Sequence, residues 1–186
     1  MREIRAILAD LDLEVVSMKE AGFLADIVEN GQSFEENAVI KAKAVAALCD
    51  DIVLADDSGL EVDFLNKEPG IYSARYLGED TPYSVKNQKI IERLAGVEKE
   101  KRTARFVCCI AAVFPDGSLK VTRGTVEGII WEYPMGENGF GYDPIVYVPE
   151  YHKTTAQLSE AEKNKISHRG KALELMKEQI RQYLRM

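Results

Sequence analysis

Long apolar stretches and an excess of positive charge are both missing from this 186-residue sequence. No apolar run approaches the roughly 20 residues that a membrane-spanning helix needs. The first ten residues lack the basic-then-apolar layout of a signal peptide, and no transit or lipidation signal is visible, so we expect a cytoplasmic protein without a membrane partner. The formal charge of −7 argues against broad binding of nucleic-acid polymers, because phosphate backbones require a basic surface.

Cysteine is scarce as well, with residues at positions 49, 108 and 109 alone. Their spacing fits no metal-ligand pattern, and the adjacent Cys108 and Cys109 would point to opposite faces of a strand. We therefore expect buried free thiols. The remaining composition, 46% hydrophobic and 30% charged, is typical of a soluble globular protein whose length suits one domain with a sizeable core.

Helical and strand periodicities are visible near the N-terminus. Residues 2–11 place apolar side chains on one helical stripe, and residues 13–17 favour a short strand. Ser33 and Glu36 fit the Ser-x-x-Glu capping box of a helix that we expect over residues 31–49.

The stretch VLADDSGLEV places two carboxylates, Asp56 and Asp57, after an apolar run. Residues 51–55 predict a short buried strand, so both aspartates should lie just past its C-terminal end, in a Ser-Gly turn at the edge where α/β sheets bind ligands. Neighbouring like charges repel, and a tight turn that holds them usually has a cation, a proton or a ligand to offset them. We expect a functional site here.

The rest of the sequence alternates between turns, strands and helices. Asp116-Gly117 predicts a turn between two strands, and Ser159 with Glu162 forms a second capping box. The expected elements are a turn-rich segment over 66–80, a helix over 84–96, strands within 103–148 interrupted by a glycine-rich loop over 133–144, and one or two helices over 158–184 with a joint near His168.

Three polar clusters could carry chemistry: Glu36, the Asp56–Gly59 stretch, and the late basic group of Lys163, His168 and Arg169. Hard cations such as Mg²⁺ take carboxylate oxygens and leave substrate phosphates and waters to complete the shell. Glu36 and the aspartate pair could supply that half-shell, while Lys and Arg could hold the remaining phosphate oxygens.

Each cluster also has a purely structural interpretation. Glu36 can serve only its capping box, the aspartate pair can be a solvated turn, and His168 can simply begin a helix. The Lys/Glu run over 160–165 can be a solvated helix face, and the loop GENGFGYD can be a glycine-rich hairpin. No single cluster decides between these alternatives.

Five ordered segments together resemble the motifs of the inosine triphosphate pyrophosphatases, also called non-canonical purine nucleoside triphosphate pyrophosphatases. The segments read SFEENAVIKA, LADDSGLEV, PGIYSARY, GFGYDPIVYVP and KNKISHRGKAL. The resemblance extends from Arg2 to about Leu184, nearly the whole chain. Five motifs in order are far more specific than any one of them.

The resemblance implies an α/β fold: a single domain over residues 1–186 with an elongated mixed central β-sheet, flanking helices and two lobes around a cleft. It implies Mg²⁺-dependent hydrolysis of the α–β phosphate bond of ITP, dITP or XTP, giving the monophosphate and pyrophosphate and so cleaning the nucleotide pool. The partners it implies are a small-molecule nucleotide substrate and a second copy of the chain, in a homodimer.

The resemblance also assigns roles to residues. Asp57 matches the metal-linked general base and Glu36 the other metal ligand, while Phe140 would stack on the purine and Arg169 can donate to a 6-keto oxygen. Asp56, Lys41 and Arg75 are expected near the cleft. The full set of implied substrate-binding residues is Ser58, Phe140, Gly141, Tyr142, Asp143, Lys163, His168 and Arg169.

One departure from the family pattern lies at the start. Family members normally begin with a β-strand and a Thr-x-Asn-x-x-Lys loop that contacts the triphosphate, whereas this sequence begins at Met1 with neither. A late gene start, a truncated paralogue or an expressed fragment would each explain this, and we expect an N-terminally truncated form of an otherwise ordinary enzyme.

Three other functions remain open. A nucleotide-binding or interaction protein could keep the cleft but lose turnover together with the phosphate loop. A receiver-type phospho-aspartate switch would need alternating parallel βα units, which the strand-rich run over 103–130 opposes. The septum-inhibition-type nucleotide pyrophosphatases are a near neighbour, but the five motifs fit the inosine triphosphate group better.

Overall fold

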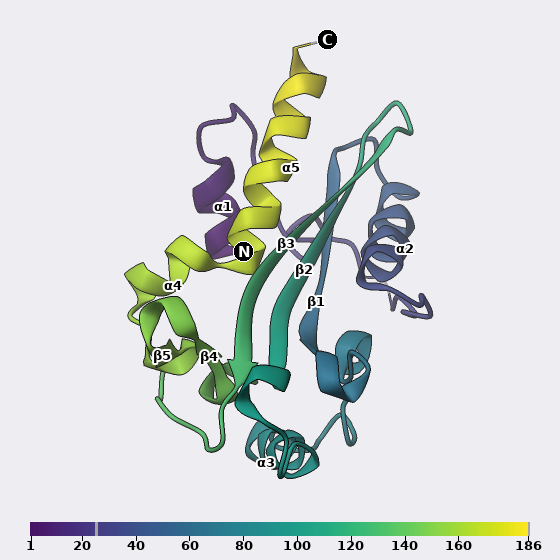
Figure 1. Ribbon diagram of the computed structural model, residues 1–186. Helices are drawn as coiled ribbons and strands as arrows, with labels where there is room; N and C mark the ends of the chain where they lie inside the picture. Colours follow the sequence, from purple (N-terminus) through teal and green to yellow (C-terminus); the bar gives the residue numbers. More distant parts are fainter. Residues whose placement is uncertain (25, 186) are drawn as a thin grey trace. The chain divides into compact units, whose positions relative to one another are not determined.

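A computed structural model describes residues 1–24 and 26–185 of the chain and confirms the α/β class (Figure 1). Single-turn 3₁₀ helices connect several of the longer elements. In chain order, the α-helices and β-strands are α1 (Arg2–Leu8), α2 (Phe34–Ala46), β1 (Val53–Val62), α3 (Tyr83–Arg93), β2 (Thr103–Val113), β3 (Leu119–Ile130), β4 (Val146–Val148), β5 (Lys153–Thr154), α4 (Glu160–Ile166) and α5 (His168–Leu184).

The strands of the described residues form one sheet whose order follows the chain, β1-β2-β3-β4-β5. β4 pairs antiparallel with both β3 and β5, with Ile129 opposite Tyr147 in the first ladder. The expected turn lies between β2 and β3, where the Ser118 N–H donates to Asp116 Oδ1 at 2.8 Å. Antiparallel neighbours joined by such short turns exclude the alternating parallel βα units of a receiver domain.

The chain divides into two compact units. Unit 1 contains Met1–Asp57, Cys108–Gly124 and His168–Met186, and unit 2 contains Ser58–Val107 and Thr125–Ser167. Strands β1, β2 and β3 each contribute residues to both units.

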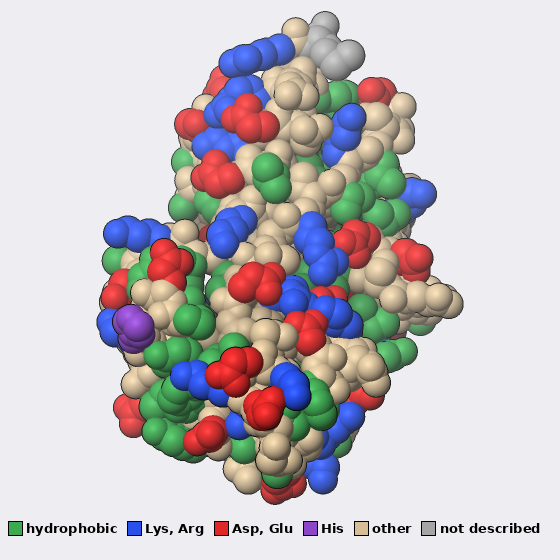
Figure 2. All heavy atoms as spheres, viewed as in Figure 1, with side chains coloured by type: hydrophobic (Ala, Val, Ile, Leu, Met, Phe, Trp, Pro, Cys, Tyr) green, Lys and Arg blue, Asp and Glu red, His purple; other side chains and the backbone are tan. Residues whose placement is uncertain are grey.

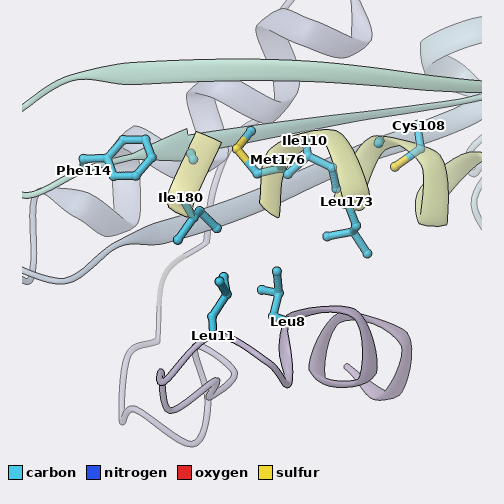
Figure 3. Close-up of a cluster of buried hydrophobic side chains, with 10 residues drawn as sticks. Leu8, Leu11, Cys108, Ile110, Phe114, Leu173, Met176 and Ile180 are labelled. Atoms are coloured by element: carbon cyan, nitrogen blue, oxygen red, sulfur yellow. The ribbon is translucent and has the colours of Figure 1, made fainter. Parts of the chain in front are cut away.

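The core of unit 1 packs α1 and α5 against β2, and α1 lies alongside α5 in Figure 1. Leu8 and Leu11 point toward the α5 side chains, which include Leu173 and Ile180 (Figure 3). Apolar residues three and four apart on α5 share one face of the helix and are buried as far as Ile180. Leu184, the next apolar residue at this spacing, is exposed.

The core of unit 2 gathers the second half of β1, α3 and the segment around β4. Its buried residues are Leu60, Val62, Leu65, Ile90, Leu94, Ala104, Ile130, Tyr142, Ile145 and Val146. Within the described part of the chain, Cys108 and Cys109 on β2 form no disulfide and are buried, as the sequence predicted, whereas Cys49 is only half-buried.

Two local predictions were wrong. Residues 13–17 form no strand and lie outside the five-stranded sheet of the described residues. β1 is longer than expected and continues through Asp56, Asp57 and Gly59 to Val62, so the aspartates lie within a strand rather than in a turn. The two carboxylates can continue the strand because successive side chains point to opposite faces.

Charge is distributed without a dominant basic region on the face that Figure 2 displays, where acidic and basic side chains intermingle. Within residues 1–24 and 26–185, no helix combines the length and apolar character that crossing a membrane would require.

Candidate functional site

Asp57 of β1 anchors a polar cluster in unit 1. Its Oδ1 accepts a hydrogen bond from Lys41 Nζ of α2 at 2.9 Å, and the same ammonium bonds Glu29 Oε2 at 3.2 Å. The Asp57 side chain is only 12% exposed and that of Lys41 20%. A single cation is therefore shared between two carboxylates in a half-buried setting.

Burial and charge oppose each other in this cluster. Burial raises the pKa of Asp57, and this effect, aided by the nearby Glu29 charge, outweighs the lowering by Lys41. For Lys41 burial acts to lower the pKa, but the two carboxylates raise it above its ordinary value. The pKa values of both partners of this ion pair are raised because Glu29 stabilises the Lys41 ammonium and repels the Asp57 carboxylate.

The start of α2 brings Asn37 to the same cluster, with Glu36 preceding it in the chain. Ser33 Oγ caps the helix by accepting the Glu36 N–H at 3.1 Å, but the Glu36 carboxylate accepts the Gln32 N–H at 2.6 Å instead of closing the predicted capping box. The fully buried Asn37 donates from Nδ2 to Asp57 Oδ2 at 3.4 Å. Glu36 therefore neighbours, along α2, a residue that contacts Asp57.

Asp56 points away from this cluster and has its own cation. Arg169 of α5 donates to Asp56 Oδ2 from Nη2 at 2.9 Å and from Nε at 3.2 Å. Burial acts to lower the pKa of Arg169, but the Asp56 charge raises it overall. His168 is half-buried at the first position of α5, next to Arg169.

In unit 2 the glycine-rich loop is organised around Asp143, which is 4% exposed. Its Oδ2 accepts the Phe140 N–H at 2.8 Å and a proton of Lys163 Nζ at 2.5 Å, and its Oδ1 accepts the Thr155 hydroxyl at 2.8 Å. A Cβ at Gly139 would lie 2.1 Å from Asp143 Oδ2, so this close approach requires glycine.

The same loop presents one aromatic ring outward and buries another. Phe140 is 74% exposed, and Lys163 Nζ lies 5.3 Å from the centre of its ring. Tyr142 is buried and donates its hydroxyl to the Ser73 carbonyl at 2.7 Å, with its pKa raised by burial and by Tyr83. An exposed ring beside an ammonium is suited to stacking with a flat ligand that carries acceptors on its edge.

Ser58 is the first residue of unit 2 and follows Asp57 directly. Its hydroxyl oxygen is buried and has no hydrogen-bond partner among the described residues. Buried polar groups are rarely left unpaired, so this hydroxyl fits the predicted contact to a substrate.

The carboxylates of unit 1 suit a divalent cation of the hard class. No group of three or more His, Cys, Asp or Glu side chains within the described ranges could hold a metal unaided. Mg²⁺ typically takes one or two protein carboxylates and completes its shell with water and phosphate oxygens. Asp57 and Glu36 match that donor set in kind and number.

The structure thus brings together parts of the predicted site within each unit. Asp57 meets Lys41, and Phe140 meets Asp143 and Lys163. Sequence reasoning missed Asn37, although its spacing of four residues from Lys41 would have placed both side chains on one face of α2. It also missed Thr155, for which the sequence carries no signal.

Comparisons with known proteins agree on one family. The model of the Ham1 family matches residues 1–179. A protein of Clostridium perfringens named dITP/XTP pyrophosphatase is 47% identical over 100% of this chain and 94% of its own length. The solved structure of the Staphylococcus aureus Ham1 protein has a TM-score of 0.90 and 44% identity, covering 98% of this chain and 93% of that one. A HAM1 protein from Coxiella burnetii gives a TM-score of 0.90 at 40% identity, over 97% and 92% of the two chains.

Proposed function

We propose, because this chain belongs to the Ham1 family, that it hydrolyses non-canonical purine nucleoside triphosphates such as dITP, XTP and ITP to the monophosphate and pyrophosphate. The observation that carries the proposal is the name dITP/XTP pyrophosphatase on a relative that is 47% identical across the whole chain. The partly buried carboxylate cluster of unit 1 is suited by its chemistry to a metal and phosphates, and the exposed aromatic ring of unit 2 is suited to stacking on a flat base.

Unit 1 would handle the phosphates. Asp57 and Glu36 would hold Mg²⁺, which when bound neutralises phosphate charge and favours attack by water. Asp57 would also orient the attacking water and accept its proton. Lys41 would keep the Asp57 carboxylate in place through the bond at 2.9 Å.

The glycine-rich loop of unit 2 would stack on the base. Phe140 would stack on the purine, and the Lys163 ammonium beside its ring would donate to acceptors on the purine edge. Gly141, Tyr142 and Asp143 would shape this loop. Ser58, the first residue of the unit, would pair its buried hydroxyl with the substrate.

Choice between purines would follow from hydrogen-bond polarity. His168 and Arg169 would contact the nucleotide from the start of α5. Arg169 uses its Nε and Nη2 groups to bond Asp56, so its Nη1 group would face the substrate. A 6-keto purine offers such donors an acceptor, whereas adenine offers an amino group. Opposed donors in a desolvated pocket cost on the order of a few kcal/mol, so ATP should be a poor substrate.

The test is pyrophosphate release from ITP, dITP, XTP, GTP and ATP, with and without Mg²⁺, by the wild type and by Asp57→Asn. The variant should lose on the order of a hundredfold or more in kcat while its unfolding temperature stays close to that of the wild type. Asp51→Asn, which changes an exposed aspartate just before β1, is the matched control and should keep full activity. Near-normal turnover by Asp57→Asn at saturating Mg²⁺ would contradict the assignment.

Assembly is a separate part of the proposal. Homodimer formation stays a prediction, which light scattering of the purified chain would check.

A further inference from the structure

The loop that carries Phe140 needs restraint to be useful for binding. Gly139 and Gly141 flank Phe140 and have φ angles of +77° and +66°. Glycine has many accessible backbone conformations, so an exposed ring between two glycines would lose much freedom when a ligand binds. Contacts that fix the loop beforehand would reduce that loss.

The structure fixes the loop on both sides of Phe140. On its N-terminal side, Asp143 accepts the Phe140 N–H, as described above. On its C-terminal side, Asn87 of α3 donates from Nδ2 to the Gly141 carbonyl oxygen at 3.1 Å. The bond joins residues 54 positions apart, so it ties the loop to a helix of the unit 2 core.

The first two turns of α3 reinforce this attachment. The ring of Tyr83 meets that of Tyr142 edge to face, with centroids 5.2 Å apart. Lys86, which is 1% exposed, places its ammonium 4.8 Å from the centre of the Tyr83 ring and donates to the Ala74 carbonyl at 2.5 Å. Asn87 therefore projects from a region of α3 that is itself held in place.

Within the part of the chain that the structure describes, the side-chain amide of Asn87 makes a hydrogen bond through its nitrogen but not through its oxygen. The side chain is 3% exposed, and its Oδ1 has no hydrogen-bond partner among the described residues. A buried unpaired acceptor disfavours folding, so an apolar side chain of similar size would suit this position better if packing were its sole role. The amide is explained by its bond to the loop.

We propose that Asn87 is a positioning residue for purine binding, which holds the Phe140 loop through the Gly141 carbonyl. This inference rests on the proposed function and extends it to a residue outside the five sequence motifs. Because Asn87 restrains the base-binding loop and not the phosphate groups, its loss should weaken binding in the ground state and the transition state alike. Such a change raises KM and leaves kcat nearly unchanged.

The experiment compares Asn87→Leu with Gln88→Leu, which makes the same kind of change at the exposed neighbouring position of α3. KM and kcat for ITP, inhibition by IMP, inhibition by pyrophosphate and the unfolding temperature are measured for both. Asn87→Leu should raise KM about tenfold with kcat within about twofold, the effect of losing one hydrogen bond. Inhibition by IMP should weaken about tenfold, whereas inhibition by pyrophosphate should not change.

Two more variants separate the effect of the hydrogen bond from that of packing. Asn87→Asp keeps the shape but replaces the donor with an acceptor, so it should show the same KM increase, while Asn87→Ser retains a donor hydroxyl and should recover part of the affinity. Unchanged IMP inhibition in both the Leu and Asp variants would overturn the proposal. Equal weakening of IMP and pyrophosphate inhibition would overturn it too, because the residue would then act on the whole fold.

The two proposals fail in different ways. If the wild type releases no pyrophosphate from any nucleoside triphosphate, the proposed function is wrong. Calorimetry of IMP binding to the wild type and to Asn87→Leu then tests the positioning role without turnover. If the wild type is active and Asn87→Leu has an unaltered KM, the positioning role alone is refuted.

Discussion

Asp143 lies at the centre of the glycine-rich loop, and its replacement tests how the loop is stabilised. The side chain is 6% exposed and accepts three hydrogen bonds, from the Phe140 N–H, Lys163 and Thr155. Asp143→Ala leaves the partly buried Phe140 N–H and the half-buried Lys163 ammonium without their acceptor, whereas the Thr155 hydroxyl keeps the Asp143 carbonyl oxygen at 3.0 Å. At about 1–1.5 kcal/mol for each of the two groups, we expect a loss of about 2–3 kcal/mol in the free energy of unfolding.

Asp143→Asn should cost much less, because the amide has the same shape. Its oxygen can accept from Phe140 and Lys163, and its amino group can donate to the Thr155 hydroxyl, which is able to accept. The loss is then mainly the difference between a charge-assisted and a neutral hydrogen bond, about 1–2 kcal/mol.

Thermal unfolding followed by circular dichroism measures both effects. For a chain of this length 1 kcal/mol corresponds to about 2–4 °C, so we expect Tm to fall by about 4–12 °C for alanine and by about 2–8 °C for asparagine. Equal losses in the two variants would show that the carboxylate charge, which both replacements remove, sets the cost. An alanine variant within about 1 kcal/mol of the wild type would refute the network itself.

Two further perturbations test the ion pairs. Lys41→Met removes the cation shared by Asp57 and Glu29, so the free energy of unfolding should fall by about 1–3 kcal/mol in urea titrations, and a variant as stable as the wild type would contradict the shared pairing. Asp63→Asn tests a carboxyl whose pKa is lowered, chiefly by its hydrogen bond to Arg105. A lowered pKa stabilises the fold above the unfolded value and loses that effect as pH falls, so the variant should be about 1–2 kcal/mol less stable at neutral pH, with the difference shrinking below about pH 4. A difference that grows toward low pH would contradict this sign.

Elements with local start and stop signals could be predicted from the sequence. Ser159 and Glu162 form the predicted capping box, in which each side chain bonds the other residue's N–H, and α4 begins there. The joint between α4 and α5 lies at Ser167, beside the predicted His168. Strand formation over residues 13–17 could not be judged locally, because a strand depends on a partner that may be distant in sequence.

The candidate site was predictable where its residues are close in sequence. The motif that contains Phe140 and Asp143 folds as one loop, with the aspartate bonding a backbone N–H three residues earlier. Asn87 was missed because an isolated polar residue on a helix gives no sign of being buried, and Asn37 because its spacing from Lys41 indicates a shared helix face but not what packs against that face. Their roles depend on contacts with β1 and with the loop, and packing between distant segments determines those contacts.

The adjacent aspartates illustrate how such packing separates functions. In a turn their charges would face similar surroundings, but in β1 their side chains point to opposite faces, so each carboxylate meets a different helix. Lys41 of α2 binds Asp57, and Arg169 of α5 binds Asp56, across 16 and 113 residues of sequence. Because each charge has its own cation, the surroundings of Asp57 are set independently of those of Asp56, although the two residues are adjacent in sequence.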